Sequence, residues 1–125
     1  MKHKIIYQLQ SSQNTRQIRV SKLLHHTIAL LLNRGEVFHP ILERFSLTVL
    51  DVKTSIDLKS STIFVSPINK QIDKKIIEIL NTLVPEYRKR LSKRIKLKSL
   101  PKIRFKFDEH VNEKMHLDRL LDKNL

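Results

Sequence analysis

Residues 86–107 read EYRKRLSKRIKLKSLPKIRFKF, and the spacing of their apolar residues changes at Pro101. Before the proline, apolar residues recur every three or four positions, which predicts one stripe of a helix. This stripe consists of Val84, Tyr87, Leu91 and Ile95. After the proline the period is two, which predicts a strand with an apolar face and a basic face. The apolar face consists of Ile103, Phe105 and Phe107.

The same stretch carries ten Lys and Arg side chains between positions 88 and 106, and no acid. They are Arg88, Lys89, Arg90, Lys93, Arg94, Lys96, Lys98, Lys102, Arg104 and Lys106. Because apolar residues alternate with the charge, we expect folded elements to hold these cations, with Lys89, Lys93 and Lys96 opposite the apolar stripe. We predict all ten as RNA-binding residues, although Arg88, Arg90 and Arg94 could equally lie over apolar neighbours with their stems.

The whole chain has 125 residues and a formal net charge of +13, which predicts one domain with an anionic partner. Nucleic acid is the usual partner of such a protein; an anionic membrane surface and basicity that only maintains solubility are the alternatives. The sequence contains no cysteine, which fits a cytoplasmic location. The apolar run near the N-terminus is too short for a signal peptide, and no stretch approaches a membrane span.

Several kinds of site are excluded by composition and spacing. Gly35 is the only glycine, whereas a phosphate loop, a dinucleotide fingerprint and the Gly-x-x-Gly clamp each need two or more. His25 and His26 are adjacent, and His110 and His116 are six apart, so no pair has helical metal-ligand spacing. No carboxylates have the spacing of an acid–base pair. We therefore expect no metal, no cofactor and no catalytic residues.

The first half of the chain predicts a helix and a hairpin. Asn14 or Thr15 can cap a helix that begins near Arg16 and ends at Gly35 in a left-handed C-cap. Its buried stripe is expected to comprise Val20, Leu24, Thr27, Ile28 and Leu31, widened by Ile18, Leu23 and Leu32. Strands are expected over residues 45–53, with either a bulge or two partly covered faces, and over residues 60–67, with a turn between them.

The second half predicts two helices and a strand. Asp73 can cap a helix that Pro85 interrupts, and a new helix then begins near Glu86. The strand at 102–107 follows, and residues 111–125 are a docked helix or a tail. The fold class is therefore α+β, a three-stranded sheet with helices over one face. Phe64 falls on the other face, where it either packs under another segment or stacks a base.

The ordered set of residues resembles the ribosome-binding factor A family over almost the whole chain. The shared residues are Arg19-Val20, Pro40, Leu42, Val52-x-x-Ser55-x-Asp57-Leu58, Ile63-Phe64-Val65-Ser66, Arg88-x-x-Leu91-x-x-Arg94-x-x-Leu97-Lys98-x-x-Pro101-x-Ile103-x-Phe105-x-x-Asp108 and Leu120-Leu121. The resemblance implies a KH-like fold of type II order (α-β-β-α-kink-α-β). Leu83-Val84-Pro85 stands where the family has Ala-x-Gly, so the kink is expected at Pro85.

The resemblance also implies a function. It implies binding to the small (30S) ribosomal subunit, to its 16S ribosomal RNA and to neighbouring ribosomal proteins during late maturation, without catalysis. The expected domains are an N-terminal arm (1–15), a KH-like RNA-binding domain (16–109) and a C-terminal helix or tail (110–125), in a monomer. The alternatives are a basic module that binds an acidic protein and a small RNA-processing enzyme.

Overall fold

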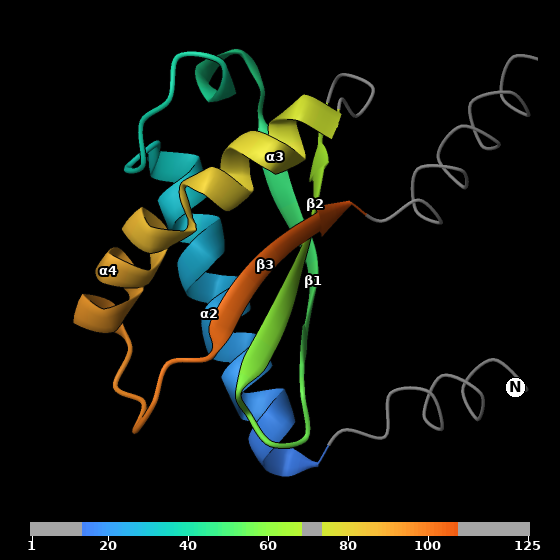
Figure 1. Ribbon diagram of the computed structural model, residues 1–125, viewed down its shortest axis with the longest axis vertical. Helices are drawn as coiled ribbons and strands as arrows, with labels where there is room; N and C mark the ends of the chain where they lie inside the picture. Colours follow the sequence, from blue (N-terminus) through green and yellow to red (C-terminus); the bar gives the residue numbers. More distant parts are fainter. Residues whose placement is uncertain (1–13, 69–73, 108–125) are drawn as a thin grey trace, which may run out of the picture.

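The computed structural model describes residues 14–68 and 74–107, which form one sheet and its helices (Figure 1). The elements are α2 (Thr15–Arg34), a 3-10 turn η1 (Leu42–Arg44), β1 (Leu47–Thr54), β2 (Ser60–Pro67), α3 (Lys74–Thr82), α4 (Val84–Arg94) and β3 (Lys102–Phe107). The predicted order of helices and strands is confirmed. The expectations for the N-terminal arm through residue 13, for the Asp73 cap and for the segment after 107 lie outside the described residues.

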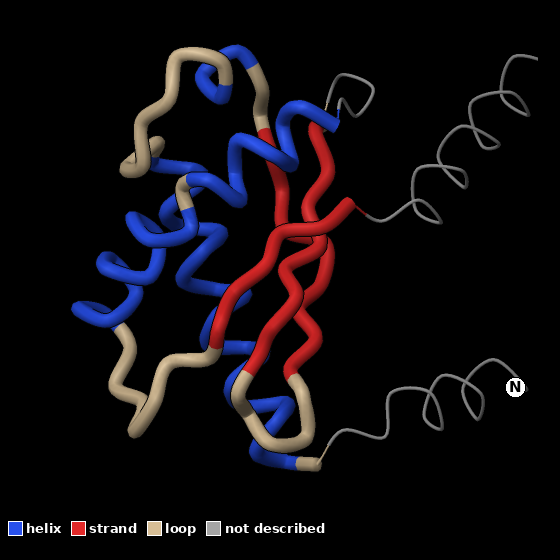
Figure 2. The backbone as a smooth tube through the Cα atoms, viewed as in Figure 1, coloured by secondary structure: helices blue, strands red, loops and turns tan. Residues whose placement is uncertain are grey.

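The sheet has the order β1-β2-β3, with β2 in the middle (Figure 2). β1 and β2 pair as an antiparallel hairpin, and the register shifts between Val49 and Asp51, which agrees with the first of the two alternatives, a bulge. β3 pairs with β2 in parallel, with Ile63 opposite Phe105 and Phe64 opposite Lys106. A parallel neighbour requires a crossover connection, and α3 and α4 supply it.

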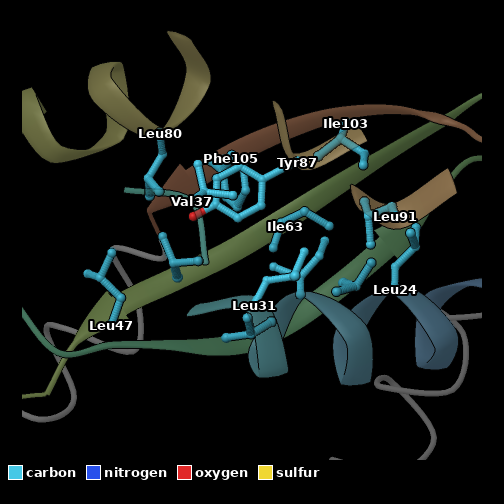
Figure 3. Close-up of a cluster of buried hydrophobic side chains, with 14 of the residues drawn as sticks. Leu24, Leu31, Val37, Leu47, Ile63, Leu80, Tyr87, Leu91, Ile103 and Phe105 are labelled. Carbon is cyan, nitrogen blue, oxygen red and sulfur yellow. The ribbon is translucent and has the colours of Figure 1, made fainter. Parts of the chain in front are cut away.

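The helices cover one face of this sheet, and the core lies between the two layers (Figure 1). α2 packs mainly on β1, whereas α3 and α4 lie over β3. Ile63, Leu91 and Phe105 are fully buried there, and Figure 3 shows them beside Tyr87 and Leu24. No helix of the described residues lies on the opposite face, where the strands present their polar positions.

Both ends of α2 are fixed by local chemistry. The side chain of Asn14 accepts from the backbone N–H of Gln17, whose side chain accepts from the N–H of Asn14, which forms a capping box. At the other end, Gly35 adopts φ 59° and ψ 33°, as predicted. The N–H groups of Gly35 and Glu36 donate to Leu32 and Leu31, which is a Schellman motif. This turn fixes the direction in which Glu36 leaves the helix.

Two expectations about helix faces were wrong. Ile18 and Leu23 do not widen the buried stripe of α2, because they are 41% and 38% exposed. α4 ends at Arg94, so Lys96 lies in the following loop rather than on the helix face. Ile95 is buried as predicted, but its backbone is extended, so the helix ends one residue before it, at Arg94.

Polar side chains tie the helices to the strands inside the core. The hydroxyl of Thr54 lies 2.8 Å from the Ser21 hydroxyl on α2 and 2.9 Å from the Ser61 hydroxyl on β2. Asn81, near the end of α3, accepts from the backbone N–H of Phe105 at 2.8 Å and donates to its carbonyl at 3.0 Å. Asn81 therefore bonds β3 as a neighbouring strand would, and it sets the position of that strand under α3 and α4.

Candidate nucleic-acid interface

Arg88 is engaged inside the fold. Its Nη1 donates to the carbonyl of Pro101, and its Nη2 donates to the carbonyl of Leu100 at 3.4 Å. The side chain thereby fastens α4 to the loop that leads into β3. Because its terminal nitrogens bond the protein's own backbone, the geometry assigns Arg88 to positioning β3 rather than to an exposed anion site.

Arg90 and Arg94 share a carboxylate that comes from far along the chain. Arg94 Nη2 lies 2.5 Å from Glu36 Oε1, and Arg90 Nη1 lies 3.5 Å from the same oxygen. The hydrogen bond from Arg94 is the largest cause that lowers the pKa of Glu36 below its ordinary value of 4.5, and the charges of both arginines add to it. Glu36 therefore partly neutralises one side of α4.

Lys89 and Lys93 are the free cations of α4. Both are exposed and lie one helical turn apart, on one side of the helix. With Glu86, Arg90 and Arg94 they line a shallow cavity of about 250 Å³. This arrangement presents two strongly hydrated point charges to an approaching anion, with guanidinium groups at its edge.

Lys96 and Lys98 extend this surface beyond the end of α4. Both are exposed, whereas Leu97 between them and Leu100 after them pack against the core. The packing of Leu97 and Leu100 anchors the loop to the core, and the side chains of Lys96 and Lys98 are left exposed to solvent. Lys89, Lys93, Lys96 and Lys98 are hereafter called the helix surface.

Lys102, Arg104 and Lys106 lie on a different side of the molecule. They are exposed, whereas Ile103 and Phe105 between them are buried against the helices. Since successive side chains of a strand point to opposite faces, these three cations point away from α4. The ten predicted residues therefore do not form one patch. They comprise the helix surface, three arginines held by protein contacts and a separate basic row on the open face of the sheet.

Sequence reasoning missed two residues of these surfaces, Glu36 and Lys53, and left the role of Phe64 undecided. Glu36 follows the C-cap glycine, and nothing in the sequence indicates its contact with α4, 54 residues away from Arg90. Lys53 shares the open face with β3, and its Nζ lies 5.7 Å from the ring centroid of Phe64. Phe64 itself is half-buried and lies on the face that no described helix covers.

Another cavity among the described residues, of about 470 Å³, contains none of the ten cations. It lies where α2 ends, and its lining combines apolar side chains such as Leu31, Val37 and Phe38 with polar ones such as His39 and Glu43. Burial raises the pKa of Tyr87 to about 12. Over the described ranges there is no cluster of three or more His, Asp or Glu that could hold a metal ion. Nor does any helix within those ranges have the length and apolar character needed to cross a membrane.

The element order, the mixed three-stranded sheet and the one-residue junction between α3 and α4 define a KH-like α+β domain. The family description "Ribosome-binding factor A" matches residues 16–121, and the chain belongs to this family. It is 39% identical over 106 residues to ribosome-binding factor A of Methylobacterium sp. (strain 4-46), covering 85% of this chain and 76% of that protein. The protein of Rhodopseudomonas palustris (strain TIE-1) is 37% identical over 108 residues, covering 86% and 79%.

Solved structures agree on the fold. The crystal structure of ribosome-binding factor A from Thermus thermophilus superposes with a TM-score of 0.59 at 20% identity, covering 72% of this chain and 93% of that chain. A homology model of the Thermus thermophilus factor, as fitted into a cryo-EM map of a 30S complex, gives a TM-score of 0.51 at 19% identity, covering 66% of this chain and 89% of that chain. The predicted family and the predicted KH-like fold are confirmed.

Proposed function

We propose that the protein binds the small (30S) ribosomal subunit, contacts its 16S ribosomal RNA during late maturation, and acts in the cytoplasm by binding rather than by catalysis. Two observations support this proposal. The chain belongs to the ribosome-binding factor A family, and the related Thermus thermophilus factor has been fitted into a map of a 30S complex. The helix surface supplies exposed positive charge, which contact with an RNA backbone requires.

The observation that carries the proposal is the pair Lys89 and Lys93. Both side chains are exposed on a helix whose opposite side, through Tyr87 and Leu91, is completely buried. The core therefore holds the backbone of α4 rigidly while the lysines remain free to meet phosphates. Lysine acts as a point charge and reads no base edges, so these contacts provide affinity, whereas the folded shape of the RNA provides specificity.

Four of the ten predicted cations belong to this proposed contact directly: Lys89, Lys93, Lys96 and Lys98. Arg90 and Arg94 are held by Glu36, which leaves each guanidinium with further N–H donors at the edge of the same cavity. We assign these two arginines a supporting part. Arg88 stabilises the approach to β3, so its replacement should act through stability instead of affinity.

Sedimentation of the purified protein with purified ribosomal subunits tests the proposal. The protein should travel with the small subunit and remain in the supernatant with the large subunit alone. Release by nuclease digestion of the pellet is expected, because RNA provides the contact. Equal sedimentation with both subunits, or retention on a protein component after the RNA is digested, would contradict the proposed partner.

A further inference from the structure

The open face of the sheet carries an aromatic ring among cations. Phe64 is in the central strand, with Asp51 opposite it on β1 and Lys106 opposite it on β3. The Nζ of Lys53 lies over the ring at 5.7 Å from its centroid. Since Lys53 is exposed, the position of its ammonium shows that one face of the ring borders solvent. Within residues 14–68 and 74–107, no helix covers the ring on the side opposite α2, α3 and α4.

The charge around this ring is unbalanced. The outward positions of the three described strands carry four cations (Lys53, Lys102, Arg104 and Lys106) and one acid, Asp51. The Oδ1 atom of Asp51 already accepts from the backbone N–H of Val52 at 2.9 Å. The group at the centre of this face is an aromatic ring, whereas a site for the carboxylates of an acidic peptide would have a cation there. A ligand that combines negative charge with an aromatic component therefore matches the face better than an acidic peptide does.

We propose that the open face of the sheet is a second RNA-contact site, in which Phe64 stacks an unpaired base and Arg104 and Lys106 bind the adjoining phosphates. This inference rests on the proposed function. The ligand is a single-stranded segment, because bases in an A-form duplex are stacked on each other and do not offer a face to a protein ring. Every base has a π-face, so the site accepts any sequence.

Lys53 has a defined part in this site. Its contact with Phe64 is an exposed cation–π interaction, which is weaker than the stacking of a base on an aromatic ring. A base that stacks on Phe64 therefore displaces the ammonium. Because the lysine side chain is long and flexible, the displaced ammonium can then reach a phosphate of the same RNA segment, and Lys53 still contributes to binding.

The second site is separate from the helix surface. The cations of β3 point away from α4, and the sheet and its core lie between the two surfaces. A segment bound at Phe64 does not compete for Lys89 and Lys93. The protein then holds two parts of the folded RNA at once, a structured part by its phosphates and an unpaired part by stacking.

Tryptophan fluorescence gives a direct test, because the chain contains no tryptophan. We suggest Phe64→Trp as the reporter and Phe38→Trp as its matched control, since Phe38 is 63% exposed in the loop after α2 and belongs to neither surface. The inference predicts saturable quenching of Phe64→Trp by short oligouridine and little quenching of Phe38→Trp. Equal quenching of Phe64→Trp by single-stranded and duplex RNA would overturn it, as would resistance of that tryptophan to acrylamide, which would mean that another segment covers the ring.

The loss variant is Phe64→Leu, which removes the ring but retains an apolar side chain. Its affinity for oligouridine should fall about 5- to 100-fold, and its melting temperature should stay close to that of the parent. Phe38→Leu should bind as the parent does. If Phe64→Leu retains full affinity while Lys89→Gln with Lys93→Gln weakens subunit binding, the sheet site is wrong and the proposed function stands. If the protein does not bind the small subunit at all, the proposed function itself fails.

Discussion

The rings of Tyr87 on α4 and Phe105 on β3 meet edge to face, with centroids 5.2 Å apart and planes inclined by 60° (Figure 3). Both side chains are almost completely buried. Because Phe105 points toward α4, its neighbours Arg104 and Lys106 must point to the other face of the sheet. This contact therefore places the cations of β3 on a different face of the domain from Lys89 and Lys93 of α4.

Leu91→Ala should lower the free energy of unfolding by about 2–5 kcal/mol, since Leu91 is fully buried between α4 and the sheet and truncation leaves a cavity. Denaturant titration measures the change. Ile56→Ala is the matched control, because Ile56 is 81% exposed and its truncation should change stability by less than about 0.5 kcal/mol. Similar midpoints for both variants would mean that the packing face of α4 is assigned wrongly.

Thr54→Val should destabilise the protein by about 1–3 kcal/mol, although the side chain keeps its shape. The substitution removes the hydroxyl that joins Ser21 to Ser61, and both remaining hydroxyls lie in the buried core. Thr48→Val, a half-buried position on the same strand, should be close to neutral. Thermal unfolding of the two variants tests this prediction. An equal loss of stability in both would show that the hydrogen bonds of the Thr54 hydroxyl to Ser21 and Ser61 contribute nothing.

Gly35→Ala should cost about 1–2 kcal/mol, because the residue has φ 59° and an L-residue with a Cβ is strained there. No atom lies within 4 Å of the added Cβ, so the cost is conformational and not a clash. Gly35→Asn should lose less stability, since asparagine tolerates the left-handed region better. A lower free energy of unfolding for Gly35→Asn than for Gly35→Ala, measured by chemical denaturation, would contradict the argument.

Glu36→Gln should remove a pH-dependent contribution to stability. The pKa of Glu36 is lowered in the folded protein, so its ion pairs stabilise the fold fully above the ordinary value of 4.5 and are lost as the pH falls through the lower folded value. Melting temperatures should therefore differ most between parent and variant near neutral pH and converge in acid. A constant difference at every pH would exclude this role.

The same substitution also releases Arg90 and Arg94, and the affinity for the small subunit should rise with a steeper dependence on salt. Glu43→Gln is the matched control. It adds the same net charge from η1, on a side chain that is exposed and outside the cavity of α4. Equal gains in affinity would show that net charge alone, and not the freed guanidinium groups, is responsible.

The elements of this fold were predictable because local chemistry sets them. Asn14 and Gly35 delimit α2, and the alternation around Phe105 defines both faces of β3. Contacts between distant parts of the chain were not predictable. Glu36 reaches Arg94 only because a Schellman turn directs it and α4 packs beside α2.

The central claim is that Lys89 and Lys93 bind phosphates of the small subunit, and the salt dependence of affinity tests it most directly. Each phosphate contact contributes about 0.7–0.9 to the slope of log K against log salt. The double substitution Lys89→Gln with Lys93→Gln should therefore flatten the slope by roughly 1.5 units and leave the melting temperature nearly unchanged. Lys22→Gln with Lys74→Gln removes the same charge from exposed positions outside both surfaces, and should alter the slope little. An unchanged slope and affinity for the α4 variant would contradict the account.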